Sequence, residues 1–350
     1  MAATVVGSAH PYERLTPQRL LASLDAVGFR GDGRLLQLNS YENRVFQVLL
    51  EDGSAVVTKF YRPARWTDGQ ILEEHAFALA LAAQELPVIA PLPLAAVTTP
   101  EFVGLQCLGE PPTLARQIDE GTDFRWAVYP RRSGHGPELD DPSVLQWLGR
   151  FVGRVHTAAG TARFAERRTM DPASFGHDRL AVLMRSETII EEQRDGYRAL
   201  CEQALAAADC AFDALPDLTL RRVHGDLHPG NILWRDEGPH IVDLDDCCNG
   251  PAVQDLWMLL SGTGEAMRTQ LAQLLEGYTQ FCAFDARELA LIEPLRTLRM
   301  VRHSAWLAER WTDPAFPVAF PWFGSPNYWL QQQQQLREQL EAMAEPPLAL

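Results

Sequence analysis

The chain has 350 residues, of which 46% are hydrophobic and 22% are charged, and its formal net charge at pH 7 is −15. A chain of this length can bury a large core, and two lobes are expected rather than one globule. Its negative charge argues against nucleic acid or an anionic membrane as the main partner, because such a surface repels phosphate groups.

The sequence shows no pattern typical of export or membrane insertion. It contains no run of eighteen apolar residues, the length at which a stretch becomes a candidate for a membrane-spanning helix. The first ten residues lack the basic and apolar regions of a signal peptide. We therefore expect a cytoplasmic protein that does not bind a membrane.

The six cysteines show no metal-ligand spacing, and in a cytoplasmic chain they are expected to be reduced. Cys247 and Cys248 are adjacent, which permits two interpretations. They either form a redox sensor or are small buried residues, and the second interpretation is favoured.

The first predicted element is a helix over residues 17–27. The pair Thr16-Pro17 is typical of a helix start, and Gly28 stands where a helix would end. Apolar residues between them share one face, so the helix is expected to cover a core.

Two strands are predicted next, over residues 44–50 and 55–60. The dipeptide Asp52-Gly53 between them is a strong hairpin signal. Lys59 lies near the end of the second strand between apolar neighbours. This setting favours a lysine held over a pocket rather than on an open face.

The following helix begins with a capping box formed by Thr67 and Gln70. It carries Glu73 and Glu74, which point about 100° apart, so only one of them can face Lys59. We choose Glu74, because the residues three and seven positions after it are apolar and make its face a buried one.

Three further strands are predicted, over residues 92–97, 102–105 and 126–129, to complete a mostly antiparallel sheet. The last strand leads into a segment with proline and glycine, which is a natural boundary between lobes. The sequence thus predicts an N-terminal lobe over residues 1–130 and a C-terminal lobe over residues 131–350.

The C-terminal lobe is expected to be mainly helical, because apolar residues recur there with helical spacing. The predicted helices cover residues 142–156, 180–192, 198–215, 255–260, 266–281 and 286–311, and a polar helix runs on from residue 331. Pro294 is expected to kink one of them, and His156 is expected to be a packed core or C-terminal-turn histidine, not a ligand.

A short hairpin in this lobe has acidic residues at one end. Its two apolar runs, residues 232–234 and 240–242, extend by about 3.3 Å per residue out and back, so Asp243 returns to the level of Asn231. Asp226 precedes Asn231 by five positions in the same loop. Carboxylate and amide oxygens suit Mg²⁺, which takes one or two protein oxygens and completes its shell with water and phosphates.

Two histidines flank this loop. His224 and His228 are four residues apart, a spacing that can bind zinc when it falls on a helix. Gly225 and Pro229 rule out a helix here, so the histidines are expected to hydrogen-bond the loop instead.

The run His224-Gly225-Asp226-x-His228-x-x-Asn231, followed by Asp243 after an apolar stretch, resembles the catalytic and metal loops of the aminoglycoside-phosphotransferase-like kinases, which are relatives of protein kinases. Within that superfamily the chain resembles the stress response kinase A family, also called the RdoA or YihE protein kinase family. The stretches that carry this likeness are residues 38–45, 59–63 with 71–75, and 243–246 with 249–252 and 254–260.

The resemblance implies an α+β, bilobal protein kinase-like fold with ATP and Mg²⁺ between the lobes. It also implies transfer of a phosphoryl group from ATP to serine or threonine side chains of proteins, and a role in surviving stress. Lys59, positioned by Glu74, would bind the phosphates of ATP. Ser40 would contact ATP from a polar loop, although a serine in an ordinary polar turn is an equally weighted alternative.

The resemblance assigns the chemistry to the hairpin and its loop. Asp226 would accept the proton of the acceptor hydroxyl, and Asn231 and Asp243 would hold Mg²⁺. Asp245 is either a third metal ligand or the cap of the next turn. Asp255 either braces the catalytic loop through backbone amides, as its family counterpart does, or caps a helix.

Three functions remain to be separated. The first is a serine/threonine protein kinase, and the second keeps the mechanism with a small hydroxyl compound such as an aminoglycoside, choline or homoserine as acceptor. An acidic acceptor site would favour such a cationic compound, but the overall acidity cannot be localised from the sequence. The third is a non-catalytic nucleotide-binding scaffold, and intact Lys59, Asp226, Asn231 and Asp243 argue against it. A monomer is expected in each case.

Overall fold

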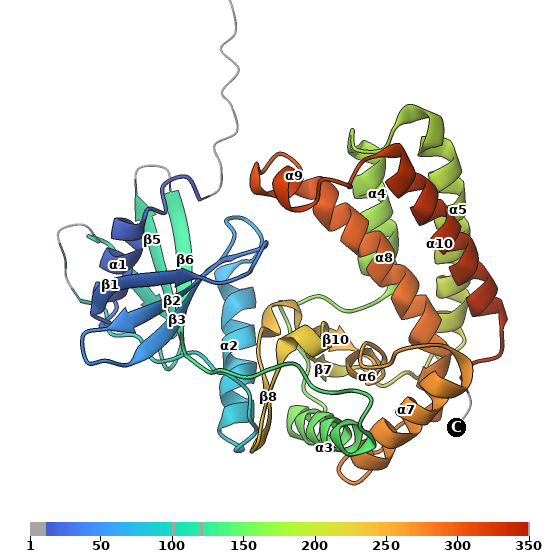
Figure 1. Ribbon diagram of the computed structural model, residues 1–350, viewed down its shortest axis with the longest axis horizontal. Helices are drawn as coiled ribbons and strands as arrows, with labels where there is room; N and C mark the ends of the chain where they lie inside the picture. Colours follow the sequence, from blue (N-terminus) through green and yellow to red (C-terminus); the bar gives the residue numbers. More distant parts are fainter. Residues whose placement is uncertain (1–11, 98, 100–101, 120–121, 349–350) are drawn as a thin grey trace, which may run out of the picture. The chain divides into compact units, whose positions relative to one another are not determined.

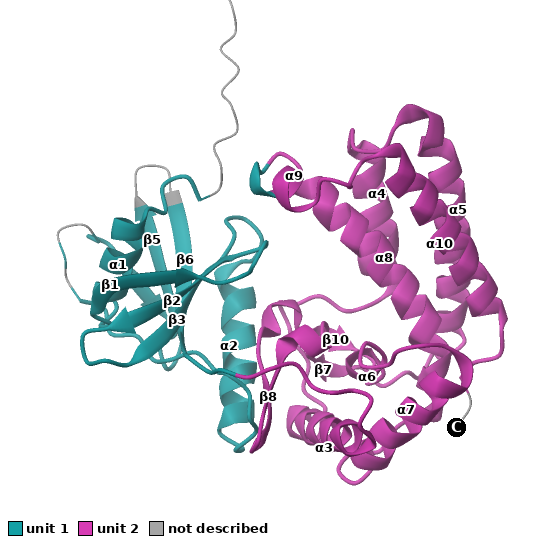
Figure 2. Ribbon diagram, in the orientation of Figure 1, with its two compact units in different colours: residues 1–133, 313–315 teal, residues 134–312, 316–350 magenta. Residues whose placement is uncertain are grey.

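The computed structural model describes residues 12–97, 99, 102–119 and 122–348 (Figure 1). The chain divides into two compact units (Figure 2). Unit 1 comprises Met1–Ser133 and Asp313–Ala315, and unit 2 comprises Gly134–Thr312 and Phe316–Leu350. A short segment from late in the chain is therefore part of the N-terminal unit.

Unit 1 is built on a six-stranded sheet with the strand order β1-β2-β3-β6-β5-β4. All neighbouring strands pair antiparallel, as the sequence predicted. The strands are β1 (Gly31–Gln37), β2 (Arg44–Leu50), β3 (Ala55–Phe60), β4 (Gln106–Leu108), β5 (Leu114–Asp119) and β6 (Thr122–Pro130). The bounds predicted for β2 and β3 are confirmed.

Two of the predicted strands are wrong. Residues 92–97 form no strand, because Pro91 and Pro93 have no N–H to donate and a regular ladder cannot form there. Residues 102–105 form a turn in which Gly104 has a positive φ of 84°. The sheet is extended instead by β1, β4 and β5, which the sequence analysis missed.

Helices α1 (Pro17–Asp25) and α2 (Asp68–Ala82) lie on opposite sides of this sheet (Figure 1). Side chains alternate between the two faces of a strand. Trp126 and Val128 of β6 accordingly pack in the cluster that α1 joins, while Ala127 packs with Ile71 of α2. Helix α1 ends two residues before the predicted end.

The capping box predicted at the start of α2 is confirmed. The Thr67 side chain accepts from the Gln70 N–H at 3.1 Å, and the Gln70 side chain accepts from the Thr67 N–H at 3.1 Å. These reciprocal bonds fix where the helix begins. The position of Glu74, within its buried face, follows from that start.

Unit 2 is mainly helical, as predicted. Its longer helices are α3 (Pro142–Ala159), α4 (Asp178–Arg185), α5 (Glu191–Asp213), α7 (Gly264–Tyr278), α8 (Ile292–Glu309) and α10 (Pro326–Ala344). The shorter ones are α6 (Gln254–Trp257), α9 (Ala315–Ala319), which begins in unit 1, a π-helix (Ala173–His177) and the 3-10 helices Pro229–Asn231, Leu244–Asp246 and Ala286–Leu291. Helices α4, α5, α8 and α10 pack as one group, and α3 packs along α7.

Several helix bounds differ from the predicted ones. The helix predicted over residues 180–192 ends at Arg185, because the next residue is extended and the side chain of Arg194 bonds the carbonyl groups of Ser186 and Ile189. Pro294 is the third residue of α8 and does not kink a longer helix. A proline is tolerated in the first turn, where its missing N–H has no helical partner.

Two small antiparallel pairs complete unit 2. One pair is β7 (Arg221–Val223) with β10 (Cys248–Gly250), and the other is β8 (Ile232–Arg235) with β9 (Gly238–Ile241). Within the part of the chain that the structure describes, every helix is too short or too polar to cross a membrane.

Candidate active site

The hairpin predicted around residues 232–242 forms as β8 and β9. Ile232 pairs with Ile241, and the Val242 N–H donates to the Asn231 carbonyl at 3.1 Å. Asp243 is the next residue, so Asn231 and Asp243 stand at the same end of the hairpin. The structure thus brings together the two residues that were predicted from the sequence to be metal ligands.

The donor set at this end of the hairpin fits a hard cation. The side-chain amide nitrogen of Asn231 donates to the backbone carbonyl of Asp226 at 3.0 Å, a contact that uses the nitrogen and not the oxygen of the amide. Asp243 has the left-handed conformation, with φ 60° and ψ 66°, and its carboxylate makes no capping bond to the 3-10 helix it precedes. An amide oxygen and a carboxylate oxygen are ligands that Mg²⁺ accepts.

Asp245 lies inside the 3-10 helix Leu244–Asp246 and not at its N-cap, a position that Asp243 occupies. Its backbone carbonyl accepts a hydrogen bond of 2.6 Å from the side chain of Arg167. A role as third metal ligand stays a prediction. No group of three or more His, Cys, Asp and Glu side chains among the described residues is arranged to hold a metal ion, and Mg²⁺ in kinase sites needs fewer protein ligands than that.

Both oxygens of the Asp226 carboxylate have a donor nearby. Arg299 Nη1, from α8, contacts Oδ1, and His228 Nε2 lies 3.5 Å from Oδ2. His228 Nδ1 accepts from the Gly230 N–H at 3.0 Å, so the proton of the neutral ring is on Nε2 and faces Asp226. Burial lowers the pKa of His228, although the charge of Asp226 opposes this effect, so the neutral form of the ring is favoured.

His224 also hydrogen-bonds the loop, as predicted. Its Nε2 lies 3.0 Å from the Val242 carbonyl, which joins the loop to the returning end of the hairpin. The next residue, Gly225, has a positive φ of 82°, and a Cβ there would collide with the Asp246 carbonyl. A glycine is therefore required directly before Asp226.

Asp255 hydrogen-bonds the backbone of the loop that contains Asp226. Its Oδ2 accepts from the His224 N–H at 2.7 Å, and its Oδ1 accepts from the Gly225 N–H at 2.9 Å. Asp255 lies within the first turn of α6, whose N-cap is Val253. The neighbouring Gln254 donates from its amide nitrogen to the Gly225 carbonyl at 2.8 Å. Asp255 is therefore bonded to backbone amides of this loop and is not the N-cap of α6.

A buried chain of polar groups supports Asp255. His156 Nε2 lies 3.1 Å from Asp255 Oδ2, and His156 Nδ1 lies 2.9 Å from the hydroxyl of Tyr278. Burial lowers the pKa of His156. Burial alone would raise the pKa of Asp255, but the hydrogen bonds that its carboxylate accepts, first from His156 and also from the Gly225 N–H, outweigh burial and the pKa lies below its usual value. The prediction that His156 is a core residue is confirmed.

In unit 1, Lys59 faces Glu74. Lys59 Nζ lies 3.9 Å from Glu74 Oε1, and the side chains are 9% and 3% exposed. Lys59 Nζ also lies 5.1 Å from the centroid of the Tyr61 ring. A buried charge is costly unless an opposite charge lies close to it. The partner of Lys59 is Glu74, as predicted from the sequence.

The polar loop that contains Ser40 is held by its own side chains. Ser40 Oγ accepts from the Asn43 N–H at 3.3 Å, which is the ordinary turn contact of the alternative interpretation. Asn43 Oδ1 accepts from the Arg62 N–H at 3.1 Å. A contact between Ser40 and ATP stays a prediction.

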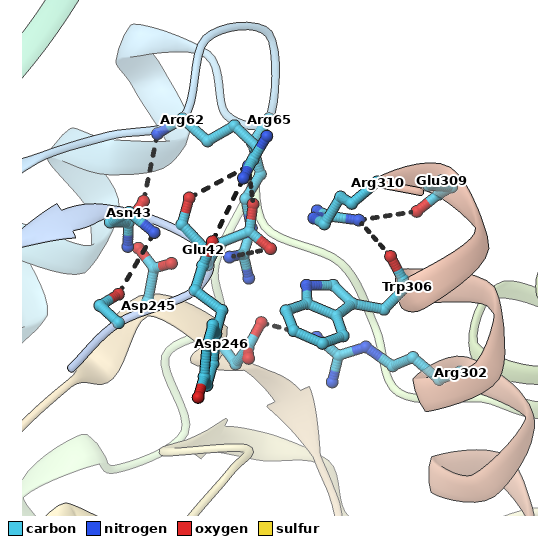
Figure 3. A network of polar contacts seen from close by, with 12 residues as sticks. Glu42, Asn43, Arg62, Arg65, Asp245, Asp246, Arg302, Trp306, Glu309 and Arg310 are labelled. Carbon is cyan, nitrogen blue, oxygen red and sulfur yellow. Dashed lines mark hydrogen bonds and ion pairs between the residues drawn. The ribbon is translucent and has the colours of Figure 1, made fainter. Parts of the chain in front are cut away.

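Arg62 fastens this loop further. Its guanidinium donates to the Tyr41 and Glu42 carbonyls at 3.2 and 3.1 Å, and it pairs with the Glu42 carboxylate at 3.1 Å. Figure 3 shows Arg65 pointing to the same carboxylate, at 3.0 Å. The loop is thus fixed by two arginines that follow β3 in the chain.

Cys247 and Cys248 are both buried, with exposed fractions of 1% and 2%. Burial raises the pKa of Cys248, which keeps its thiol protonated and unreactive. The favoured interpretation, small buried residues, is confirmed.

The chain is similar to characterised kinases over nearly its whole length. A profile of the phosphotransferase enzyme family matches residues 34–292. Stress response kinase A of Escherichia coli strain K12 is 40% identical over 343 residues, which cover 98% of this chain and 98% of that protein. Serine/threonine protein kinase RdoA of Salmonella typhimurium strain LT2 is 39% identical over 343 residues with the same coverage.

A solved structure shows the same fold. Amicoumacin kinase hAmiN, in complex with AMP-PNP, Ca²⁺ and Ami, superposes with a TM-score of 0.69 at 20% identity and covers 95% of this chain and 94% of its own. The α+β kinase-like fold, with an antiparallel sheet in its N-terminal part and a helical C-terminal part, is thereby confirmed. The chain belongs to the phosphotransferase enzyme family and, within it, to the stress response kinase A family.

Proposed function

We propose that this protein is an ATP- and Mg²⁺-dependent kinase that phosphorylates serine or threonine side chains of other proteins and acts in the response to stress. Its relatives named stress response kinase A and serine/threonine protein kinase RdoA match it over 98% of its length. The observation that carries the chemistry is the braced loop that holds Asp226 and Asn231 beside Asp243.

Residues of unit 1 bind the nucleotide in this proposal. Lys59 binds the α- and β-phosphates of ATP, and Glu74 orients its ammonium group, as the corresponding pair does in kinases. The buried contact between them supports this role. Ser40 and the backbone amides of its loop bind phosphate oxygens, and the contacts of Arg62 give that loop a fixed shape.

Asn231 and Asp243 hold Mg²⁺ through an amide oxygen and a carboxylate oxygen. When bound, the ion neutralises charge that develops on the phosphates during transfer. Asp245, which is adjacent to this pair in the chain, is the candidate for a further ligand.

Asp226 acts on the acceptor. The acceptor oxygen forms a bond to the γ-phosphorus while the bond from that phosphorus to the β,γ-bridging oxygen breaks, and ADP leaves. Asp226 accepts or orients the proton that the acceptor hydroxyl loses. The hydrogen bonds of Asp255 to the loop backbone keep this carboxylate in place.

The alternative acceptor, a small cationic hydroxyl compound, keeps the same mechanism. An observation in unit 2 disfavours it, since Arg299 contacts the carboxylate of Asp226 and would repel an ammonium group that approached the base. A cytoplasmic location and a monomeric state stay predictions.

The test is transfer of label from γ-labelled ATP to three acceptor classes in parallel: a protein mixture, an aminoglycoside and an amino alcohol. The proposal expects label on protein, and loss of that label with EDTA or with Asp226→Ala. Label on the small molecules alone would replace the protein-kinase assignment with the alternative. Equal label from Asp226→Ala would remove the mechanism.

A further inference from the structure

Helix α8 presents basic side chains at the catalytic loop of an otherwise acidic protein. The chain has a net charge of −15, yet between Glu293 and Glu309 the helix carries Arg296, Arg299 and Arg302 and no acidic residue. Each of these arginines has a carboxylate partner, so the helix supplies cationic groups rather than a net positive charge. A cationic group beside the proposed catalytic residue favours an anionic group in what binds there.

Two of these arginines are committed to structural contacts. Arg296 pairs with Glu293 at 3.0 Å and lies over the Trp257 ring at 5.1 Å. Arg302 pairs with Asp246 at 2.6 Å, a contact that Figure 3 shows, and lies over the Phe175 ring. Each guanidinium has a fixed carboxylate on one side and an aromatic face on the other.

Arg299 differs from them, because it contacts the carboxylate of Asp226, the proposed catalytic base. The side chain of Arg299 is 42% exposed, so an incoming molecule can reach it. An acceptor hydroxyl must come within about 3 Å of the Asp226 carboxylate for its proton to be accepted. Any acceptor in that position therefore has Arg299 as a direct neighbour.

The contact with Arg299 also has to change when the acceptor binds. Oδ1 of Asp226 is engaged by Arg299, and Oδ2 faces the Nε2–H of His228. The acceptor hydroxyl therefore competes with Arg299 for Oδ1 of Asp226. A second carboxylate would relieve this competition, because a guanidinium binds carboxylates through two parallel hydrogen bonds and can exchange one such partner for another.

We propose that Arg299 is a specificity-determining residue that binds an aspartate or glutamate side chain next to the acceptor serine or threonine. The carboxylate of the substrate takes Arg299 from Asp226 and leaves Asp226 to accept the hydroxyl proton. This inference rests on the proposed protein-kinase function and names the substrate class, polypeptide segments in which acidic residues flank the acceptor. A neutral or basic flank would leave Arg299 on Asp226.

The test is a peptide library with a fixed central serine and randomised flanking positions, labelled by the wild-type enzyme with γ-labelled ATP. We expect enrichment of Asp and Glu near the serine. One selected peptide is then made with Glu, Gln or Lys at the preferred position. We expect kcat/KM to be about tenfold higher with Glu than with Gln, a ratio that corresponds to about 1.4 kcal/mol, and to be lowest with Lys.

Variants separate recognition from folding. Arg299→Gln should remove the difference between the Glu and Gln peptides, and Arg299→Lys, which keeps the charge, should retain part of it. Arg287→Gln is the matched control, since Arg287 is an exposed arginine whose partners are Asp217 and Asp285, and its flank preference should equal that of the wild type. The melting temperature of each variant reports whether it folds.

The inference would be overturned by equal kcat/KM for the Glu and Gln peptides in the wild type, or by a preference that persists in Arg299→Gln. Label on protein in the same experiments would still support the proposed function. A stronger preference for a phosphoserine flank than for Glu would overturn the choice of a carboxylate. Absence of label from both the library and a protein mixture would overturn the proposed function and this inference with it.

Discussion

Arg62 and Asp313 lie 251 residues apart in the sequence, and their side chains are joined by a hydrogen bond of 2.9 Å from Arg62 Nη2 to Asp313 Oδ2. Asp313 also accepts from the Ala315 N–H at 3.1 Å and so starts α9. Because Arg62 binds the carbonyl groups of Tyr41 and Glu42 as well, this contact ties the segment 313–315 to the loop that contains Ser40.

Asp313→Asn should weaken this connection. We expect a loss of about 1–3 kcal/mol in the free energy of unfolding, because Arg62 stays buried with one charged partner fewer. If the loop binds phosphates, KM for ATP should rise more than kcat falls. Urea denaturation and steady-state kinetics measure the two effects, and Asp217→Asn, in an exposed pair, should change stability by less than about 1 kcal/mol. An unchanged KM for ATP would contradict the role of the loop.

Lys59 and Glu74 should be energetically coupled. Removing either partner leaves a buried charge without its match, which typically costs about 3–5 kcal/mol. Lys59→Met and Glu74→Gln should therefore each reduce stability, and the double variant should lose less than the two losses added together. Lys59→Met should also weaken ATP binding. Glu73→Gln is the control on the same helix, and coupling of Lys59 to Glu73 instead of Glu74 would contradict the pairing.

Asp255→Asn should lower both stability and turnover. The amide nitrogen of an asparagine would face one of the two backbone N–H groups, of His224 or Gly225, that the carboxylate now accepts. We expect a loss of about 1–3 kcal/mol in stability and of about 10²-fold in kcat, since a misplaced base reacts slowly. Asp226→Asn should lose turnover while its melting temperature stays close to that of the wild type. Full activity of Asp255→Asn would show that the brace is dispensable.

The features that could be predicted from the sequence are those in which neighbouring residues determine the structure. The capping box at Thr67 fixes the phase of α2 and with it the direction of Glu74. The β8–β9 hairpin sets Asn231 beside Asp243 through its register. In both cases the spacing along the chain is short enough for backbone geometry to decide the outcome.

The features that were missed depend on partners distant in the sequence. Arg299 meets Asp226 across 73 residues, and its position in α8 resembles that of any surface arginine. Asp313 likewise contacts Arg62 across 251 residues of sequence. The error at residues 92–97 is of a different kind, because Pro91 and Pro93 are local signals against a regular ladder and outweigh the strand-like composition.

Glu288 should make stability depend on pH. It is buried and accepts from the Val253 N–H at 2.9 Å, and burial raises its pKa to about 7 from the ordinary value of 4.5. Between these two values the folded state keeps a proton that the unfolded state has released, so stability falls as pH rises through this window and stays at its lower level above about pH 7.

Glu288→Gln should remove this dependence, because glutamine keeps an oxygen for the Val253 N–H and cannot ionise. The stability difference between variant and wild type should shift in favour of the variant by up to about 3 kcal/mol between pH 4.5 and pH 8. Urea denaturation at a series of pH values measures it. Parallel pH curves for the two proteins would show that Glu288 does not titrate in this range.

Calorimetric titration of ATP into the protein, with Mg²⁺ and then with EDTA, tests the central claim most directly. We predict binding that depends on Mg²⁺ in the wild type, and that is strongly weakened in Asp243→Asn and in Lys59→Met although both variants remain folded. Binding of equal strength in EDTA, or wild-type protein that takes up no ATP with Mg²⁺ present, would contradict the assignment of a magnesium-dependent kinase.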